Sequence, residues 1–178
     1  MQVDKKKKKG LIIVNTGHGK GKSSAAFGVM FRAIGQNMKV AIVQYIKGKW
    51  RTGEGVHAKS IEGLTHHVMG LGFTWESKDI NKDIEAAKSA WEKSKEYIND
   101  DKHDLVILDE FTYTLKYGWL DVSEVLEVLQ NKPKMKHIII TGRDCHEKII
   151  ELADLVTEMK LIKHPSDQGI PAQRGIEF

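Results

Sequence analysis

Short apolar runs alternate along the chain with longer segments whose apolar residues recur at helical spacing. The runs at residues 10–16, 39–46, 64–69, 104–109, 137–141 and 155–159 predict strands, and the segments 23–36, 81–99, 122–130 and 147–153 predict helices. In segment 81–99, Ile84, Ala87, Trp91 and Ile98 follow the three- and four-residue steps of an amphipathic helix, which places Trp91 in the core. This alternation predicts an α/β fold, with an open, mostly parallel sheet and helices on both faces.

The length and composition are those of one ordinary soluble domain. The chain has 178 residues, of which 40% are hydrophobic and 29% charged. No apolar run approaches the roughly 20 residues that a membrane span needs, and the apolar run at 11–14 is too short for a secretory signal. We therefore expect no membrane association and a cytoplasmic location.

The excess of positive charge comes from the amino-terminal residues. The net charge is +4, but the run Lys5 to Lys9 supplies five lysines, and without it 23 basic residues face 24 acidic ones. The folded part is thus close to neutral, and we expect no nucleic-acid partner. Residues 1–9 are interpreted as a basic, disordered arm, for which solvation is favoured over contact with RNA or an anionic surface.

A glycine-rich loop lies between the first predicted strand and the first predicted helix. Its residues are Gly17, His18, Gly19, Lys20, Gly21, Lys22, Ser23 and Ser24. Glycines let backbone amides turn toward one anion in front of a helix N-terminus, and a lysine adds charge for phosphate oxygens. The spacing departs from the standard phosphate-loop template because Thr16 stands where its first glycine belongs. The flanking strand and helix still favour a loop that binds ATP.

Two acidic residues end the apolar strand predicted at 104–109. Asp109 and Glu110 would lie at the carboxyl edge of the sheet, where open α/β proteins bind their ligands. Carboxylates in this position hold Mg²⁺ in many phosphate-loop enzymes, together with the first hydroxyl of the helix, here Ser23. We therefore expect Mg²⁺ at Ser23, Asp109 and Glu110.

Several segments together resemble the P-loop class of ATP:corrinoid adenosyltransferases. They are TGHGKGKSSAAFG at 16–28, VQYIKG at 43–48, GFTWE at 72–76, LDEFTY at 108–113, IITGR at 139–143, and the ending from KH at 163–164 to QRGI at 173–176. The resemblance covers nearly all of residues 10–178 in the family's order, and the shortened loop is a family trait. It implies one adenosyltransferase domain over 10–178, of the RecA-like P-loop type.

The resemblance also implies a reaction. The Co(I) of a reduced corrinoid would attack the ribose 5′ carbon of ATP and expel triphosphate, in adenosylcobalamin synthesis or salvage. Lys22 and Glu110, with Mg²⁺, would stabilise the departing triphosphate. Phe73 and Trp75 would occupy the lower face of the corrinoid and remove its axial ligand, which eases reduction of Co(II). A reduced flavoprotein as electron donor and a homodimer are further implications, while known members carry a longer amino-terminal extension over the site.

Two other functions share these phosphate contacts. A hydrolase or kinase would use Glu110 to activate water or an acceptor, and a binding module would hold nucleotide or cobalamin without chemistry. The aromatic pair Phe73 and Trp75 favours the adenosyltransferase, because phosphate transfer has no use for it.

The remaining candidate ligands favour structural roles. Adjacent His66 and His67 should point to opposite faces of a strand, so they do not form a metal site together. Asp144, Cys145 and His146 are interpreted as a helix cap, because Ile149 stands where a cobalt-ligating signature would need glycine. As the only cysteine, Cys145 is expected to be a small buried residue.

Overall fold

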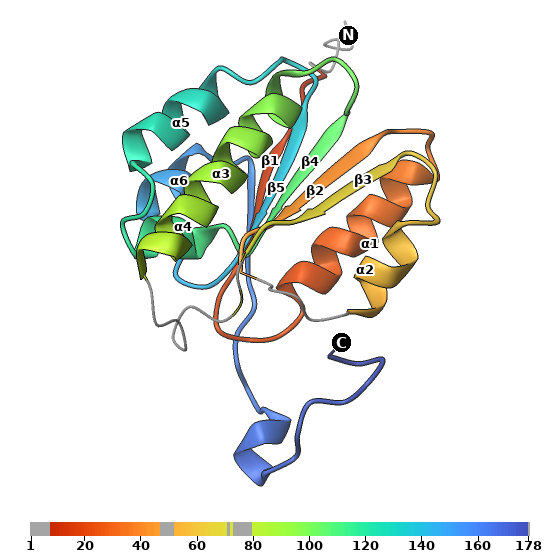
Figure 1. Cartoon of the computed structure of the whole chain (residues 1–178), viewed down its shortest axis with the longest axis vertical. Helices are drawn as coiled ribbons and strands as arrows, with labels where there is room; N and C mark the ends of the chain where they lie inside the picture. The colour runs from red at the N-terminus through yellow and green to blue at the C-terminus, as the bar shows by residue number, and fades with distance from the viewer. Residues whose placement is uncertain (1–7, 47–51, 71, 73–79, 178) are drawn as a thin grey trace, which may run out of the picture.

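The computed structural model describes residues 8–46, 52–70, 72 and 80–177, and its centre is a six-stranded sheet (Figure 1). The strands are β1 (Ile12–Thr16), β2 (Val40–Gln44), β3 (Leu64–Val68), β4 (Leu105–Asp109), β5 (His137–Thr141) and β6 (Leu155–Glu158). Their order is β3-β2-β4-β5-β1-β6, and every neighbouring pair is parallel. The predicted α/β fold is confirmed, with a sheet that is parallel throughout.

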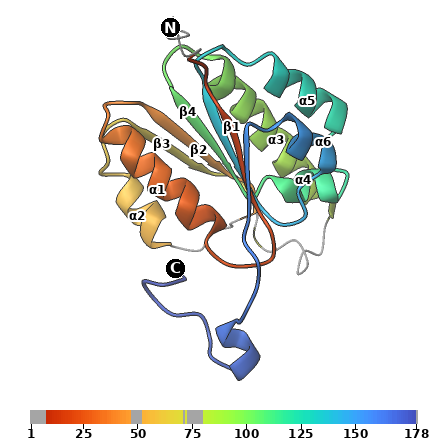
Figure 2. The same cartoon turned by 180° about the vertical axis from the view of Figure 1, so that it is seen from behind.

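Helices cover both faces of the sheet. They are α1 (Lys22–Ile34), α2 (Gly53–Ala58), α3 (Ile80–Asn99), α4 (Thr112–Lys116), α5 (Val122–Gln130) and α6 (Glu147–Leu152), with a 3-10 turn, η2, at Pro165–Gln168. Helices α1 and α2 pack on one face, and α3 to α6 lie on the other, as the two opposite views show (Figures 1 and 2). The sequence did not predict α4 or η2. No helix in the described ranges has the length and apolarity needed to cross a bilayer.

The two faces of the sheet form two apolar cores. On the α3 side Trp91 is 1% exposed, and its ring lies 5.4 Å from that of Phe111, which in turn lies 5.1 Å from Tyr45. On the α1 side Met30 packs against the sheet residues Ile107 and Ile139. Trp91 is thus a core residue, as its spacing predicted, and burying such large side chains is the main stabilising contribution to the layers.

Because all strands are parallel, their carboxyl ends meet at one edge of the sheet. The loops after β1, β4 and β5 converge there, and β5 lies between the strand that enters the phosphate loop and the strand that ends in carboxylates. Beyond β6 the chain leaves the sheet, and residues 159–177 extend past this same edge (Figure 1). The edge therefore gathers segments that are far apart in the sequence.

Candidate active site at the carboxyl edge of the sheet

The phosphate loop is supported from behind by the start of the carboxyl-terminal segment. The amide of Gly19 donates to the carbonyl of Met159 at 2.6 Å. Gly17 has φ +94°, and a Cβ on it would lie 2.6 Å from the same carbonyl oxygen. A side chain at position 17 would therefore push the loop away from its support.

Lys22 lies among other charged groups at the front of the loop. Its Nζ donates to the carbonyl of Gly19 at 2.6 Å. Burial lowers the pKa of Lys22, the positive charges of Arg143 and Lys20 lower it further, and the negative charge of Glu110 opposes them. Lys22, Arg143 and Glu110 are therefore close enough to interact, and the mutual repulsion of the cations favours the approach of an anion.

The predicted carboxylates occupy different environments. Asp109 is fully buried, and its Oδ1 and Oδ2 accept hydrogen bonds from Thr141 Oγ1 and Gln44 Nε2, each at 2.8 Å. Glu110 is half-buried and adopts a left-handed backbone conformation with φ +61°. Such a conformation costs a non-glycine residue about 1–3 kcal/mol and is found disproportionately at functional sites.

The turn after β5 completes the edge. Gly142 has φ +140°, and a Cβ there would collide with the hydroxyl of Thr112, which donates to the carbonyl of Arg143 at 2.6 Å. This close approach fixes the backbone from which the Arg143 side chain extends. Burial raises the pKa of Tyr113 to about 12, with the negative charge of Glu110 adding to the shift and Arg143 opposing it, so Tyr113 also belongs to this region.

At the rim, two loops meet at Asp144. His18, at the exposed tip of the phosphate loop, lies with its Nε2 3.1 Å from Asp144 Oδ1, and Lys116 Nζ donates to the other oxygen at 2.7 Å. Lys20, on the same loop, pairs with Glu177 of the carboxyl-terminal segment. Both contacts are partly exposed, so we attribute little stability to them.

The structure brings most of the predicted site residues to one edge. The loop from Gly17 to Ser24 and the carboxylates Asp109 and Glu110 share it, whereas Phe73 and Trp75 lie outside the described residues. We did not assign roles to Gln44, Thr141 and Arg143 from the sequence. Polar residues at or just after the carboxyl ends of buried strands are a signal that could have found all three.

The predictions for the two histidines and for the helix cap are confirmed, whereas Cys145 is less buried than predicted. His66 lies 2.9 Å from Gln44 and His67 lies 2.7 Å from the hydroxyl of Tyr97 on α3, so the two rings are on opposite faces of β3. His146 caps α6 by accepting from the amide of Lys148, as the cap interpretation required. Cys145 is half-buried against the core, and burial raises the pKa of its thiol to about 11.

The described residues contain no group of three or more His, Cys, Asp or Glu side chains that could hold a metal ion alone. The possible metal ligands at the edge are instead the oxygen atoms of a serine hydroxyl and of carboxylates. Mg²⁺ prefers such oxygen ligands and is commonly held by one or two carboxylates together with substrate phosphates. The residues present therefore fit Mg²⁺ bound jointly with a nucleotide.

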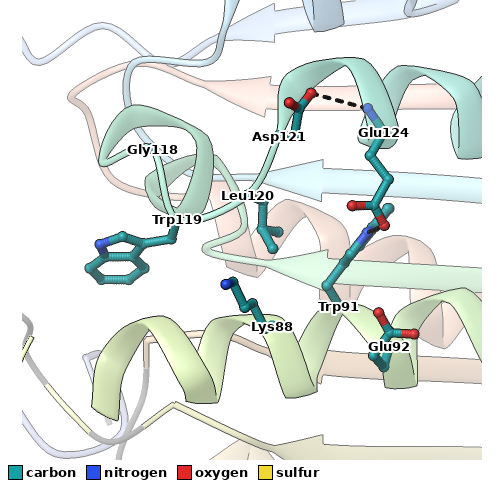
Figure 3. Close-up of a pocket in the computed structure, with 8 residues that line it drawn as sticks. All are labelled: Lys88, Trp91, Glu92, Gly118, Trp119, Leu120, Asp121 and Glu124. Carbon is teal, nitrogen blue, oxygen red and sulfur yellow. Dashed lines mark hydrogen bonds between the residues drawn. The ribbon is translucent and has the colours of Figure 1, made fainter. Parts of the chain in front are cut away.

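A cavity of about 520 Å³ lies away from the phosphate loop, between α3 and the connection from α4 to α5. In Figure 3, Lys88, Trp91 and Glu92 extend from α3, and Trp119, Leu120, Asp121 and Glu124 extend from the connection and the start of α5. Trp91 Nε1 donates to Glu124 Oε1 at 2.9 Å across it. No residue of the phosphate loop lines this cavity, so we do not assign it to ATP.

The fold and the edge define a P-loop nucleotide-binding protein, with a glycine-rich loop between a parallel strand and a helix, and carboxylates at the end of another strand. A model of the family described as "ATP:corrinoid adenosyltransferase BtuR/CobO/CobP" matches residues 8–178. The chain belongs to this family.

Relatives agree with that assignment. The chain is 51% identical over 173 residues to a corrinoid adenosyltransferase of Sinorhizobium sp, covering 96% of this chain and 81% of the relative. It is 46% identical over 171 residues to the Pseudomonas aeruginosa corrinoid adenosyltransferase and 44% over 170 residues to that of Escherichia coli K12, covering 96% of this chain and 84% and 86% of the relatives. The function predicted from the motifs is confirmed at this level: the protein is a transferase whose substrates are ATP and a corrinoid.

Proposed function

We propose that the carboxyl edge transfers the 5′-deoxyadenosyl group of ATP to the Co(I) of a corrinoid, in adenosylcobalamin synthesis or salvage. Co(I) supplies the electron pair of the new cobalt–carbon bond. The bond from C5′ to its ester oxygen breaks, and that electron pair leaves with the triphosphate. The observation that carries this proposal is the family match over residues 8–178, and the grouping of Lys22, Arg143 and Glu110 supplies charged groups for the triphosphate.

The protein needs no nucleophile of its own in this reaction, because Co(I) is a strong one. Its work is to align the ribose with cobalt and to stabilise charge on the leaving triphosphate. Lys22 and Arg143 would pair with the phosphates of bound ATP, and the negative charge that they stabilise increases when the C5′–O bond breaks. Stabilisation that grows with the leaving charge accelerates the chemical step. The proposed binding residues are Gly17, His18, Gly19, Lys20, Gly21, Lys22, Ser23 and Ser24.

Magnesium is proposed at the hydroxyl of Ser23 and the carboxylate of Glu110, with Asp109 beside them. When bound, the ion would neutralise part of the phosphate charge. Asp109 already accepts two hydrogen bonds, although each carboxylate oxygen keeps a further lone pair. Its role as a direct ligand stays a prediction, and Glu110 is the better placed of the two because it interacts with Lys22.

The remaining proposals concern the corrinoid side of the reaction. Phe73 and Trp75 are proposed to cover the lower face of the corrinoid, so that Co(II) loses its axial ligand and accepts an electron more easily. A reduced flavoprotein is proposed as the donor, and a homodimer as the assembly. All of these rest on the likeness of the motifs to those of the family.

An anaerobic assay tests the proposed reaction directly. Chemically reduced corrinoid, ATP and Mg²⁺ are mixed with the protein, and both the light-sensitive adenosylated corrinoid and tripolyphosphate should form in equal amounts. ADP with orthophosphate would instead indicate a hydrolase. Binding of either substrate without turnover would indicate a binding module.

A further inference from the structure

A continuous row of hydrogen bonds crosses four strands at the carboxyl edge. His66 Nε2 on β3 lies 2.9 Å from Gln44 Oε1 on β2, and Gln44 Nε2 lies 2.8 Å from Asp109 Oδ2 on β4. Asp109 Oδ1 lies 2.8 Å from Thr141 Oγ1 on β5. The row ends where the backbone amide of Glu110 reaches Thr141 Oγ1 at 2.9 Å.

The direction of each bond in the row follows from Asp109. A carboxylate accepts through both oxygens, so the hydroxyl of Thr141 and the amide nitrogen of Gln44 must both donate to it. The oxygen of Thr141 is then left to accept from Glu110, and Gln44 Oε1 is left to accept from His66. Gln44, Asp109 and Thr141 are each at most 1% exposed, so water does not compete for these bonds.

The row acts on the backbone of Glu110. Its backbone φ of +61° is a value that residues other than glycine rarely adopt. Without the bond to Thr141, the residue would be expected to relax toward the ordinary negative φ values, and its side chain would turn to another direction. The held conformation is the one in which the carboxylate interacts with Lys22 and with Tyr113.

We propose that Thr141, Asp109 and Gln44 are positioning residues that hold Glu110 in the left-handed conformation facing the triphosphate site. Asp109 fixes the rotor of Thr141 from one side and is itself fixed by Gln44 from the other. The conformational part of this inference stands on the hydrogen bonds alone. Its consequence for magnesium rests on the proposed function of Glu110.

Thr141→Val tests the inference, because valine keeps the branched shape and removes the hydroxyl. In protein without ATP, the amide of Glu110 should exchange with solvent at least ~5-fold faster, as expected for loss of one hydrogen bond. The magnesium concentration for half-maximal adenosylation should rise in parallel. Thr141→Ser keeps the hydroxyl and should restore both readouts.

Thr114 on α4 offers a matched control for Thr141. Thr114 is also fully buried, and its hydroxyl donates to the carbonyl of Phe111 at 2.8 Å, outside the row. Thr114→Val should lower thermal stability and leave both the Glu110 amide and the magnesium dependence unchanged. If Thr141→Val does not fold, Gln44→Met removes the donor to Asp109 from the other side and should shift the same readouts in the same direction.

The outcomes separate the two levels of the inference. Unchanged exchange of the Glu110 amide in Thr141→Val, or identical behaviour of the valine and serine variants, would overturn the positioning role. Faster exchange with an unaltered magnesium titration would uphold positioning and overturn the proposed magnesium role of Glu110. Both readouts moving with Thr141→Val, and neither with Thr114→Val, is the expected result.

Discussion

Replacing Lys22 with alanine removes the cation at the junction of the glycine-rich loop and α1. Its ammonium is half-buried, donates to Gly19 and interacts with both Arg143 and Glu110. Since the repulsion from Arg143 and the attraction to Glu110 oppose each other, we expect folding stability to change by less than about 1 kcal/mol. The effect should therefore fall on catalysis.

The size of the expected loss in kcat depends on the stage of the reaction at which the charge of Lys22 acts. Loss of one preorganised donor to a developing oxyanion typically costs ~100- to 1000-fold in kcat, or about 2.7–4 kcal/mol. Arg143 and the helix N-terminus remain in the variant and stabilise part of the triphosphate charge. We therefore expect the lower end of the range, about 100-fold.

The assay uses chemically generated Co(I) corrinoid at saturating ATP, so that weaker ATP binding does not obscure the chemical step. The matched control is Lys20→Ala on the same loop, whose partly exposed ammonium pairs with Glu177. Lys20 is also a proposed ATP-binding residue, so its loss should raise KM for ATP, while kcat at saturating ATP should fall less than ~5-fold because an exposed cation contributes only about 0–1 kcal/mol. An unchanged kcat in Lys22→Ala, or equal losses in the two variants, would refute the reasoning.

Four further predictions concern other residues. Glu110→Gln should raise the magnesium concentration for half-maximal rate, and a titration identical to wild type would exclude Glu110 as a ligand. Phe73→Ala or Trp75→Ala should abolish synthesis from Co(II) with a flavoprotein donor but spare synthesis from chemically prepared Co(I); parallel losses would indicate a structural role. Lys136 is 4% exposed and donates to several acceptors near the C-terminal end of α3. Lys136→Met should therefore cost about 3 kcal/mol in urea unfolding, and a cost under ~1 kcal/mol would contradict this. Burial would raise the pKa of Asp100, but hydrogen bonds from His103 and Lys136 outweigh it and lower the pKa to about 2. The contribution of the Asp100 carboxylate to the free energy of unfolding should be present above about pH 4 and lost as pH falls toward 2. It should amount to about 1–2 kcal/mol after solvent screening. Asp100→Asn should therefore reduce the loss of unfolding free energy between about pH 4 and pH 2.

The sheet could be predicted from the sequence because its central strands are buried on both faces. Residues 105–108 are apolar without interruption, and such a run is typical of a strand buried on both faces. Helix α4 escaped prediction because its five residues are too few to show a helical period. The hydrophobic pattern could not predict the strand order either, because the position of β5 between β1 and β4 depends on pairing between distant segments.

At the site, too, motifs made of adjacent residues were predicted from the sequence, whereas contacts between residues far apart in the sequence were missed. The phosphate loop and the pair Asp109 and Glu110 are local motifs, whose chemistry can be recognised from adjacent residues. Thr141 and Gln44 acquire their roles only because β5 and β2 flank β4 and bring two side chains to one carboxylate. No spacing within the sequence predicts that meeting.

The strand order also explains how a shortened phosphate loop can keep its shape. Because β6 pairs with β1, the chain leaving β6 passes directly behind the loop, where Met159 accepts the amide of Gly19. That bond directs one loop amide toward the protein, so side-chain cations must supply more of the charge that a triphosphate requires. Arg143 lies in the turn after β5, the other neighbour of β1, and interacts electrostatically with Lys22. The segments that follow both neighbours of β1 therefore meet at the proposed phosphate site, where one would support the loop backbone and the other would supply a second cation.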